Sequence, residues 1–418
     1  MQDDLYLGLD LGTSGARAVV INSAGAELAS AKAAMAEFGA NSRDPQIWWQ
    51  AARRAVQGAL AQIDRSRIVA LAVDGTSGTM LAVDAAGQPL ADGVMYNDAC
   101  TDASLLAAIA RNAPRTSAAH GPTSGLARAL VLQPLGAAKL LHQADWIAWN
   151  FSGRMVSDAN NALKTGYDPV EGAWPGWIAA TGLDLALLPE TIEPGTPVGR
   201  ITAAAAAAFG LPLHTQVIAG TTDGCASFLA TGAALPGEGV TAIGTTLTLK
   251  ILSDRPIFAP EHGIYSHRIL GMWLAGGASN SGGAALLAHF TAAEMVALTP
   301  MLSPAEPTGL TYYPLPKPGE RFPIADPALP SRVTPRPISD ATFLQALFEG
   351  IAGIEALGFA RLTELGTPAL LSVRSLGGAA ANPAFTAIRA RTLNAPLQPA
   401  RSDEAAVGAA LLAQRGVG

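Results

Sequence analysis

The chain has 418 residues, of which 49% are hydrophobic and 14% are charged, and its formal net charge is -6. This length predicts two large domains, because single cores seldom grow beyond about 250–300 residues. The composition is that of an apolar globular protein and excludes a disordered or fibrous chain. Lys and Arg residues are scattered without a basic stripe or tail, so we expect no nucleic-acid partner.

The cysteines and the start of the chain exclude further classes. Cys100 and Cys225 are too few for a disulfide framework and lack the paired spacing of a zinc site, so we expect two small core residues. The acidic start, Met1-Gln2-Asp3-Asp4, lacks the basic and apolar segments of a signal peptide, which predicts a cytoplasmic location. The alanine-rich run 202–210 is too short to cross a bilayer, and we expect no membrane span.

In chain order, the expected elements form a repeated unit: an apolar strand, a tip of small polar residues and usually a returning strand. The strands that open such units are Leu5–Leu9, Ile68–Val73, Gln216–Gly220 and Val240–Ile243. The returning strands are Ala16–Ile21, Thr79–Val83 and Leu247–Leu252. The likeness of 7–20 to 240–251 indicates two halves of similar construction.

Helices, a loop and one more strand complete the expectation. Apolar residues at helical spacing predict helices over 45–63, 343–362 and 403–413. Eight prolines between Pro314 and Pro337 predict an extended loop or a set of turns. Leu370–Leu376 should form a strand that ends at Gly377-Gly378.

Two of the tips are candidates for phosphate binding. A strand end rich in Gly, Thr and Ser lets backbone N–H groups approach an anion closely, and the hydroxyls add donors. A lone tip of this kind is usually an ordinary hairpin turn, but Gly12-Thr13-Ser14 and Gly244-Thr245-Thr246 supply one in each half. Asp10 precedes the first tip, where a carboxylate could hold a hydrated magnesium ion or merely cap the turn.

Asp223 follows the strand Gln216–Gly220 and is a candidate general base. A base must lie within hydrogen-bond reach of the attacking hydroxyl and be ionised, as an Asp with an ordinary pKa near ~3.9 would be. A helix N-cap is the alternative role. The sequence lacks a two-His zinc motif, a G-x-S-x-G elbow and a G-x-x-x-x-G-K-[ST] loop, which disfavours metal hydrolases, serine hydrolases and P-loop enzymes.

On these residues the chain resembles the FGGY carbohydrate kinases, within the actin and hexokinase superfamily. Leu9–Arg17 resembles the first phosphate motif, Gly220–Asp223 the segment with the catalytic base, and Gly244–Thr246 the second phosphate motif, all in family order. Gly377–Asn382 is similar to the adenosine-binding glycine segment, although Ala379 replaces an expected third glycine.

Within the family, the chain most resembles the short D-ribulose kinases of cyanobacteria and plants. The segments that carry this likeness are Asp74–Thr79, Tyr96–Cys100, Asn161–Lys164, Gly263–His267 and Gly277–Asn280. Many members carry a tryptophan and an arginine near residues 96–101 and are longer, so glycerol or a hexulose fits less well as the acceptor. D-xylulose, L-ribulose or a pentitol remain alternatives, because sugar discrimination depends on the placement of polar side chains.

The resemblance implies an α/β fold with two ribonuclease-H-like domains around a central cleft. It divides the chain into a sugar-binding domain, 1–228, and a nucleotide-binding domain, 229–402, with a C-terminal helix within 403–418 packing back on the first domain. A nonenzymatic, nucleotide-dependent switch of the same fold is the alternative from another class.

The resemblance also implies a role for each site residue, with a sugar and ATP as small-molecule partners and Mg²⁺ as the metal. Asp223 would be the catalytic base, Asp10 a magnesium and sugar ligand, and Ser77 a ligand of a sugar hydroxyl. The phosphates would lie against Gly12, Thr13, Ser14, Gly244, Thr245 and Thr246. The adenosine would lie against Gly377, Gly378 and Asn382.

Overall fold

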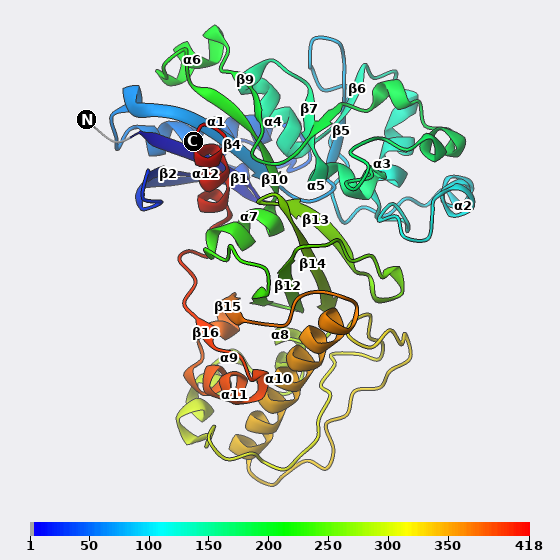
Figure 1. The fold of residues 1–418 in the computed structure, drawn as a ribbon, viewed down its shortest axis with the longest axis vertical. Helices are drawn as coiled ribbons and strands as arrows, with labels where there is room; N and C mark the ends of the chain where they lie inside the picture. The colour runs from blue at the N-terminus through cyan, green and yellow to red at the C-terminus, as the bar shows by residue number, and fades with distance from the viewer. Residues whose placement is uncertain (1–3) are drawn as a thin grey trace. The chain divides into compact units, whose positions relative to one another are not determined.

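The computed structural model describes residues 4–418, apart from the side chains of Ala379 and Ala380. Met1, Gln2 and Asp3, most of the acidic start, lie outside the described residues. The chain forms two compact units, and each is built on its own six-stranded sheet (Figure 1). Unit 1 comprises the chain up to Ala230, His267–Gly271 and Glu404–Gly418, and unit 2 comprises Thr231–Ser266 and Met272–Asp403.

The sheet of unit 1 has the strand order β3-β2-β1-β4-β10-β9. Its strands are β1 (Leu5–Leu11), β2 (Gly15–Asn22), β3 (Glu27–Ala34), β4 (Ile68–Gly75), β9 (Pro197–Arg200) and β10 (Gln216–Thr222). The first three strands form an antiparallel meander, and β1, β4 and β10 run parallel. The carboxyl ends of these three parallel strands therefore share one edge of the sheet.

The second sheet, which lies in unit 2 except for residues 267–269 of β13, has the order β13-β14-β12-β11-β15-β16. Its strands are β11 (Glu238–Ile243), β12 (Leu247–Ser253), β13 (Tyr265–Ile269), β14 (Met272–Ser279), β15 (Ser372–Leu376) and β16 (Leu397–Gln398). β11, β12, β14, β15 and β16 repeat the order and directions of β1, β2, β3, β4 and β10. The prediction of two similarly constructed halves is confirmed.

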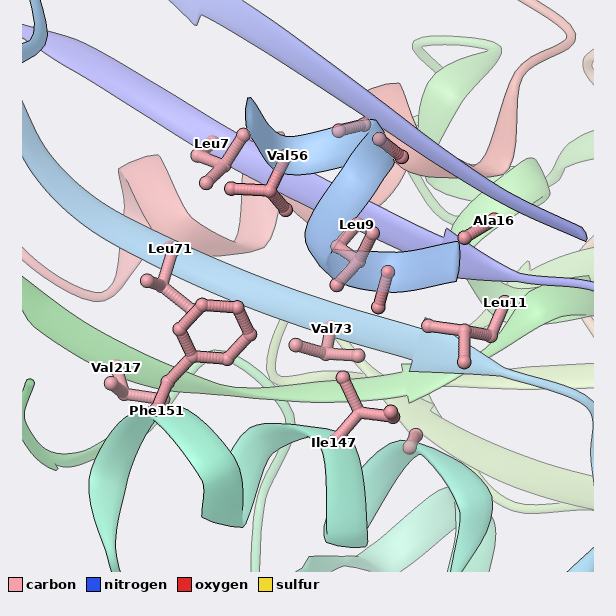
Figure 2. Close-up of a cluster of buried hydrophobic side chains, with 14 of the residues drawn as sticks. Leu7, Leu9, Leu11, Ala16, Val56, Leu71, Val73, Ile147, Phe151 and Val217 are labelled. Atoms are coloured by element: carbon pink, nitrogen blue, oxygen red, sulfur yellow. The ribbon is translucent and has the colours of Figure 1, made fainter. Parts of the chain in front are cut away.

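Helices cover both faces of the unit 1 sheet. Side chains of β1 and β4, such as Leu9 and Val73, meet Val56 of α1 (Pro45–Leu60) and Phe151 of α4 (Gln143–Ser152) in one buried cluster (Figure 2). Gly8 points to the opposite face, where a Cβ atom would lie 1.9 Å from the Ala406 carbonyl oxygen of α12 (Ala405–Arg415). Only a glycine lets this C-terminal helix approach β1 so closely.

The core helix of unit 2 is α10 (Asp340–Glu364). By length and composition alone this helix could cross a membrane, but 72% of its apolar window is buried inside the protein. Its apolar side chains pack against the sheet and the proline-rich loop. That loop behaves as predicted: residues 302–339, all of which are described, form no helix or strand. The apolar side chains of α10 are therefore explained by its place in the core of unit 2.

Two expectations are wrong. β5 (Met80–Val83) does not return against β4 but pairs with β6 (Lys139–His142) in a separate two-stranded sheet, because hydrogen bonds among residues 76, 79 and 143 turn the chain away. Cys225 is buried as expected, but Cys100 is half-exposed and lies in a loop rather than in the core.

The remaining helices and strands were not predicted, apart from a possible helix start at Asp223, where α7 begins. In unit 1 they are α2 (Ala103–Asn112), α3 (Gly125–Leu132), β7 (Val156–Asp158), α5 (Ala159–Ala162), β8 (Glu190–Ile192), α6 (Ala203–Phe209) and α7 (Asp223–Ala230). In unit 2 they are α8 (Gly283–Leu287), α9 (Ala292–Leu298) and α11 (Pro383–Leu393).

Candidate active site

Three aspartates gather at the carboxyl ends of the parallel strands of unit 1. The strand register pairs Asp10 of β1 with Asp74 of β4, and Asp74 with Thr221 of β10. Asp223 follows two residues after Thr221 and begins α7. Ligands of α/β sheets commonly bind at this edge. The fold therefore brings Asp10 and Asp223 together with a third carboxyl, that of Asp74, which was not predicted as a site residue.

The surroundings of Asp74 and Asp10 favour different protonation states for the two carboxyls. Asp74 is fully buried, and burial, followed by the nearby charge of Asp10, raises its pKa well above the ordinary value. Burial also raises the pKa of Asp10, but a hydrogen bond with Asp74 and the charge of Arg17 oppose this shift, while the charge of Asp223 adds to it. We infer that Asp74 stays protonated and can donate a hydrogen bond to an ionised Asp10.

Asp223 is half-buried at the first position of α7. Its Oδ1 accepts a hydrogen bond of 2.6 Å from the Gly224 N–H group. The positive end of the helix dipole favours a carboxylate there. The carboxylate of Asp223 thus supports the start of α7, and this contact does not exclude the role of a general base.

The tip between β1 and β2 lies beside Asp10. Thr13 and Ser14 are exposed, while Gly12 N–H donates to the Gly15 carbonyl (3.0 Å) and Met35 N–H donates to the Ser14 carbonyl (2.9 Å). A cavity of ≈ 370 Å³ opens here, and its polar lining includes Asp10, Ser14, Arg17, Lys32 and Glu404. Arg17 forms an ion pair with Glu404. The tip is therefore held by its carbonyls, and its hydroxyls face outward.

Asp10 fits the requirements of a magnesium ligand. Within the described part of the chain, no group of three or more His, Cys, Asp or Glu side chains is arranged to hold a metal ion. Mg²⁺ does not need such a group, because it usually keeps several waters and takes one or two carboxylates together with substrate phosphates. A cation beside Asp10 would also offset the burial that raises its pKa.

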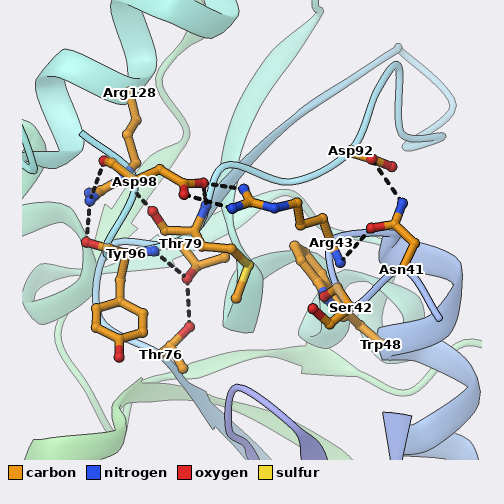
Figure 3. Close-up of polar contacts among 11 residues, drawn as sticks. Asn41, Ser42, Arg43, Trp48, Thr76, Thr79, Asp92, Tyr96, Asp98 and Arg128 are labelled. Carbon is orange, nitrogen blue, oxygen red and sulfur yellow. Dashed lines mark hydrogen bonds and ion pairs between the residues drawn. The ribbon is translucent and has the colours of Figure 1, made fainter. Parts of the chain in front are cut away.

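Half-buried Ser77 follows β4, and its chain neighbours Thr76 and Thr79 belong to a hydrogen-bonded network. Figure 3 shows Thr76 and Thr79 together with Tyr96 of this network. Thr76 Oγ1 lies 2.7 Å from Thr79 Oγ1 and 2.8 Å from Gln143 Oε1. Thr79 Oγ1 in turn accepts from the Tyr96 N–H group at 3.1 Å. The buried Nε2 of Gln143 has no hydrogen-bond partner among the described residues. The loop that carries Ser77 is therefore fixed to α4 and to the Tyr96 segment.

Arg128 of α3 anchors the Tyr96 segment from the other side. Its side chain is buried and donates to the carbonyl oxygens of Met95 (2.9 Å), Tyr96 and Asp98 (3.3 Å). Burial lowers the pKa of Arg128 to about 10, so it stays charged at neutral pH. Arg43 pairs with the Asp98 carboxylate on the exposed side. The segment around Tyr96 is thus bonded to Arg128 on its buried side and to Arg43 on its exposed side.

In unit 2 the second predicted tip, Gly244–Thr246, joins β11 to β12. The start of α8 supports it: Gly283 N–H donates to the Gly244 carbonyl (2.8 Å) and Ala284 N–H to the Thr245 carbonyl (3.1 Å). Gly377 follows the neighbouring strand, with φ +88° and only 2.5 Å between an added Cβ and the Ile243 carbonyl oxygen. The two glycine-rich strand ends therefore lie against each other.

A cavity of ≈ 640 Å³ adjoins these strand ends within unit 2. Predicted nucleotide residues that line it are Gly244, Thr245, Gly378 and Asn382, whereas Thr246 and Gly377, both described, fall just outside the lining. Asn382 caps α11, with Oδ1 accepting from Phe385 N–H (3.0 Å) and Nδ2 donating to Thr299 Oγ1 (2.8 Å). The Ala379 side chain, expected near the adenosine, lies outside the described residues.

Comparison with known families identifies the family of the chain. The model of the N-terminal domain of the FGGY family of carbohydrate kinases matches residues 5–116, and that of the C-terminal domain matches residues 239–417. The chain belongs to the FGGY family of carbohydrate kinases. The family resemblance drawn from the sequence motifs is confirmed, and the two-domain α/β fold agrees with that of FGGY kinase structures.

Individual relatives of this FGGY protein are distant. It is 25% identical over 286 residues to a xylulose kinase of Klebsiella pneumoniae, covering 64% of this chain but 59% of that kinase. It is 26% identical to an autoinducer-2 kinase of Yersinia enterocolitica, covering 99% of this chain and 87% of the relative. A xylulose kinase structure from Rhodospirillum rubrum superposes with a TM-score of 0.85 at 23% identity, covering 99% and 90% of the two chains.

The FGGY motifs identified the residues at the strand ends but not the residues that hold them in place. Asp74 could have been found, because it ends the predicted strand 68–73 as Asp10 ends the first strand. Gln143 and Arg128 carried no local signal, since they reach the site from helices more than 25 residues away along the chain.

Proposed function

We propose that this FGGY-family protein transfers the γ-phosphate of ATP to the terminal hydroxyl of a ketopentose, with Asp223 as the general base. The observation that carries the proposal is the meeting of half-buried Asp223 with Asp10 and Asp74 at one sheet edge. Phosphoryl transfer needs positioning and charge stabilisation more than covalent chemistry, so a sparse set of such groups suffices.

Each proposed role uses a feature of the site. Asp223 accepts the proton of the attacking hydroxyl, and the protonated Asp74 keeps Asp10 ionised for the sugar and for Mg²⁺. Bound Mg²⁺ supplies positive charge that offsets the phosphate oxygens. The tip Gly12-Thr13-Ser14 of unit 1 and the tip Gly244–Thr246 of unit 2 each carry hydroxyl donors that suit phosphates, and the cavity beside Gly378 in unit 2 suits the adenosine.

For the acceptor we propose D-ribulose, with Ser77 as a ligand of one of its hydroxyls. Ser77 is half-buried in a loop fixed by Thr76, Thr79 and Gln143, which suits a group that must hold one orientation. D-xylulose is the second candidate, because both a curated relative and similar structures are xylulose kinases. The autoinducer-2 kinase relatives add a further acceptor to be tested.

A coupled ADP-release assay with Mg²⁺ and ATP tests the proposal against D-ribulose, D-xylulose, L-ribulose, autoinducer-2, glycerol and no acceptor. We expect D-ribulose to raise ADP release most, with formation of the sugar phosphate seen by mass spectrometry. A stronger response to D-xylulose would replace the acceptor and keep the reaction. ADP release that no acceptor changes would contradict the kinase proposal and favour a nucleotide-dependent switch.

Matched serine variants locate the acceptor. Ser77→Ala should raise the KM for the sugar about tenfold, the effect of one lost hydrogen bond of about 1.4 kcal/mol, and leave the KM for ATP unchanged. Ser66→Ala removes an exposed hydroxyl that donates to the exposed Asp64 carboxylate, and it should change neither constant. Equal KM values in both variants would remove Ser77 from the sugar site.

A further inference from the structure

Glu320 is a buried carboxylate on the proline-rich loop, with an exposed fraction of only 3%. Its Oε1 accepts hydrogen bonds from the N–H groups of Asn280 (2.7 Å) and Arg321 (2.9 Å). Its Oε2 accepts from the hydroxyls of Ser279 (2.5 Å) and Tyr313 (3.0 Å). Burial, followed by the charge of Glu320, raises the pKa of Tyr313, so this hydroxyl keeps its proton and acts as a donor. Four donors thus offset the cost of burying the carboxylate.

Further hydrogen bonds join the proline-rich loop to the end of β14. Asn280 Nδ2 donates to the Gly319 carbonyl at 2.9 Å, and Ser281 Oγ donates to the Pro314 carbonyl at 2.7 Å. The Ser281 N–H group in turn donates to Ser279 Oγ at 3.0 Å. Three consecutive residues, of which the first ends β14, are therefore bonded directly to the loop.

The same stretch of chain supports the tip Gly244–Thr246. The Ser281 carbonyl accepts from the Leu247 N–H group at 2.8 Å, directly after the tip. Gly282 follows with φ +130°, and a Cβ atom there would lie 2.7 Å from the carbonyl carbon of Thr246. The start of α8 then bonds to two carbonyls of the tip. Contacts with the segment after β14 therefore fix the direction of the peptide groups in the tip, on which anion binding by a backbone depends.

We propose that Glu320 is a positioning residue for the nucleotide phosphates: through Ser279 and Asn280 it holds the segment that supports the tip Gly244–Thr246. The inference rests on the proposed role of this tip in phosphate binding. Donors that are fixed before the ligand arrives bind developing or existing negative charge without the cost of reorganisation. Loss of Glu320 should therefore weaken the contribution that the phosphates make to binding and leave the contribution of the adenosine unchanged.

Two substitutions of Glu320 separate its hydrogen bonds from its charge. Glu320→Ala removes all four bonds, and the affinity for ADP should fall at least about tenfold. In Glu320→Gln, Oε1 can still accept from the two N–H groups, and Nε2 can donate to the two hydroxyls, which rotate to accept. This conservative variant should keep its affinity for ADP within about threefold.

A pair of buried serines supplies a milder variant and its control. Ser279→Ala keeps Glu320 but removes one bond to its carboxylate and one from the Ser281 N–H group, so the affinity for ADP should fall about threefold to tenfold. Ser266 of β13 is equally buried, and its hydroxyl bonds instead to the N–H group (2.7 Å) and the carbonyl (2.9 Å) of Ile257. Ser266→Ala also loses two hydrogen bonds and should leave the affinity for ADP unchanged.

Titration of the full-length variants with ADP and Mg²⁺, and separately with adenosine, tests the inference without any sugar. A loss of ADP affinity in Glu320→Ala and Ser279→Ala, with adenosine affinity unchanged, supports it. An equal loss for both ligands would mean that unit 2 is merely loosened, and no loss would mean that the tip does not depend on Glu320; either result overturns the inference. If Glu320→Ala does not fold, Ser279→Ala decides.

The same proteins separate this inference from the kinase proposal. If the variants behave as expected but the wild-type protein phosphorylates no acceptor, the kinase proposal fails and the inference stands. If the wild-type protein phosphorylates a sugar while Ser279→Ala and Glu320→Ala keep their affinity for ADP, the inference fails and the kinase proposal stands.

Discussion

Asp74 pairs with Asp10 in the parallel register of β1 and β4, and burial raises the pKa of both carboxyls, more strongly for Asp74 than for Asp10. Asp74 is fully buried and Asp10 half-buried, so we infer that the shared proton resides on Asp74 and that Asp10 is the charged carboxyl of the pair. Because Asp10 faces the proposed sugar and magnesium site, the state of a residue behind it should control the pH range of activity.

Replacement of Asp74 should shift the acid limb of the pH–rate profile. In Asp74→Ala the donor to Asp10 is lost, so the pKa of Asp10 rises and a higher pH is needed to ionise it. We expect the acid limb of kcat/KM to move to higher pH and activity near pH 6 to fall. Asp74→Asn keeps a neutral donor at the same place and should retain the original limb. Identical profiles in all three proteins would show that Asp74 does not act on Asp10.

Asp223→Asn should abolish phosphorylation but preserve nucleotide binding. The amide cannot take the hydroxyl proton, and loss of general base catalysis costs about 10²- to 10⁴-fold in kcat. Its Oδ1 can still accept the Gly224 N–H group, so the start of α7 should remain intact. Isothermal titration with ADP measures binding, and ADP release measures transfer. A variant that loses ADP affinity instead would contradict the assigned role.

The sequence predicted strand ends better than strand partners. Asp10, Asp223 and the tip at Gly244 were found because glycine, hydroxyl and acidic residues after an apolar strand leave a local trace. The pairing of β5 with β6 could not be found, since nothing in residues 79–83 indicates a partner almost 60 residues later. Such partners are set by long-range packing.

The same limit applies to the supports of the site. Helical spacing predicted α1 and α10 within a few residues, because a long periodic pattern outweighs local ambiguity. In the sequence, Arg128 is a single cation without a recognisable pattern around it. Its burial against three carbonyl oxygens depends on the folded loop 95–98, which the sequence did not predict. Sequence reasoning thus reached the residues proposed to touch ligands and missed those that hold them.

Arg128→Met should weaken both the fold and the binding of the sugar. The change leaves the carbonyls of Met95, Tyr96 and Asp98 without this buried donor, which should cost about 2–4 kcal/mol in the free energy of unfolding. The sugar KM should rise more than the ATP KM, because the Tyr96 segment bonds to Thr79 beside Ser77. Urea unfolding and initial rates measure the two effects.

Arg43→Met is the control for Arg128→Met, because it makes the same change of charge and shape at an exposed arginine. Its guanidinium pairs with Asp98 at a side chain that is 45% exposed, so the variant should lose less than about 1 kcal/mol. If both arginine variants lower stability equally and leave the sugar KM alone, burial of Arg128 has no special role in positioning the segment.

Gly377→Ala should impair nucleotide binding. The residue has φ +88°, and a Cβ atom would meet the Ile243 carbonyl oxygen at 2.5 Å, so the strand end must shift away from the tip at Gly244. We expect the affinity for ADP to fall at least about tenfold, with about 1–3 kcal/mol lost in stability. Gly353→Ala on α10 meets no atom within 4 Å and should leave ADP binding unchanged. Unaltered ADP affinity in Gly377→Ala would place the nucleotide elsewhere.

Removal of one partner from the buried ion pair between Glu355 of α10 and Arg389 of α11 should strongly destabilise unit 2. Both side chains are fully buried, their two contacts measure 2.7 Å, and Thr241 of β11 and Ser375 of β15 complete the hydrogen bonding. Glu355→Gln leaves the Arg389 charge buried without its counterion, which should cost about 3–5 kcal/mol.

A matched substitution on the same helix separates the effect of burial on the cost of breaking an ion pair from the effect of losing the charge. Glu364→Gln breaks a pair with Arg361 of similar length, 2.9 Å, but the Glu364 side chain is 63% exposed, and the cost should stay below about 1 kcal/mol. Thermal unfolding of both variants, with and without ADP, measures the difference in stability. The ADP affinity should fall in Glu355→Gln alone, because the ion pair bonds to Thr241 and Ser375, which precede the two nucleotide tips. Equal melting temperatures would mean that water or a rearranged side chain satisfies Arg389, and the pair would then not hold the strand ends in place.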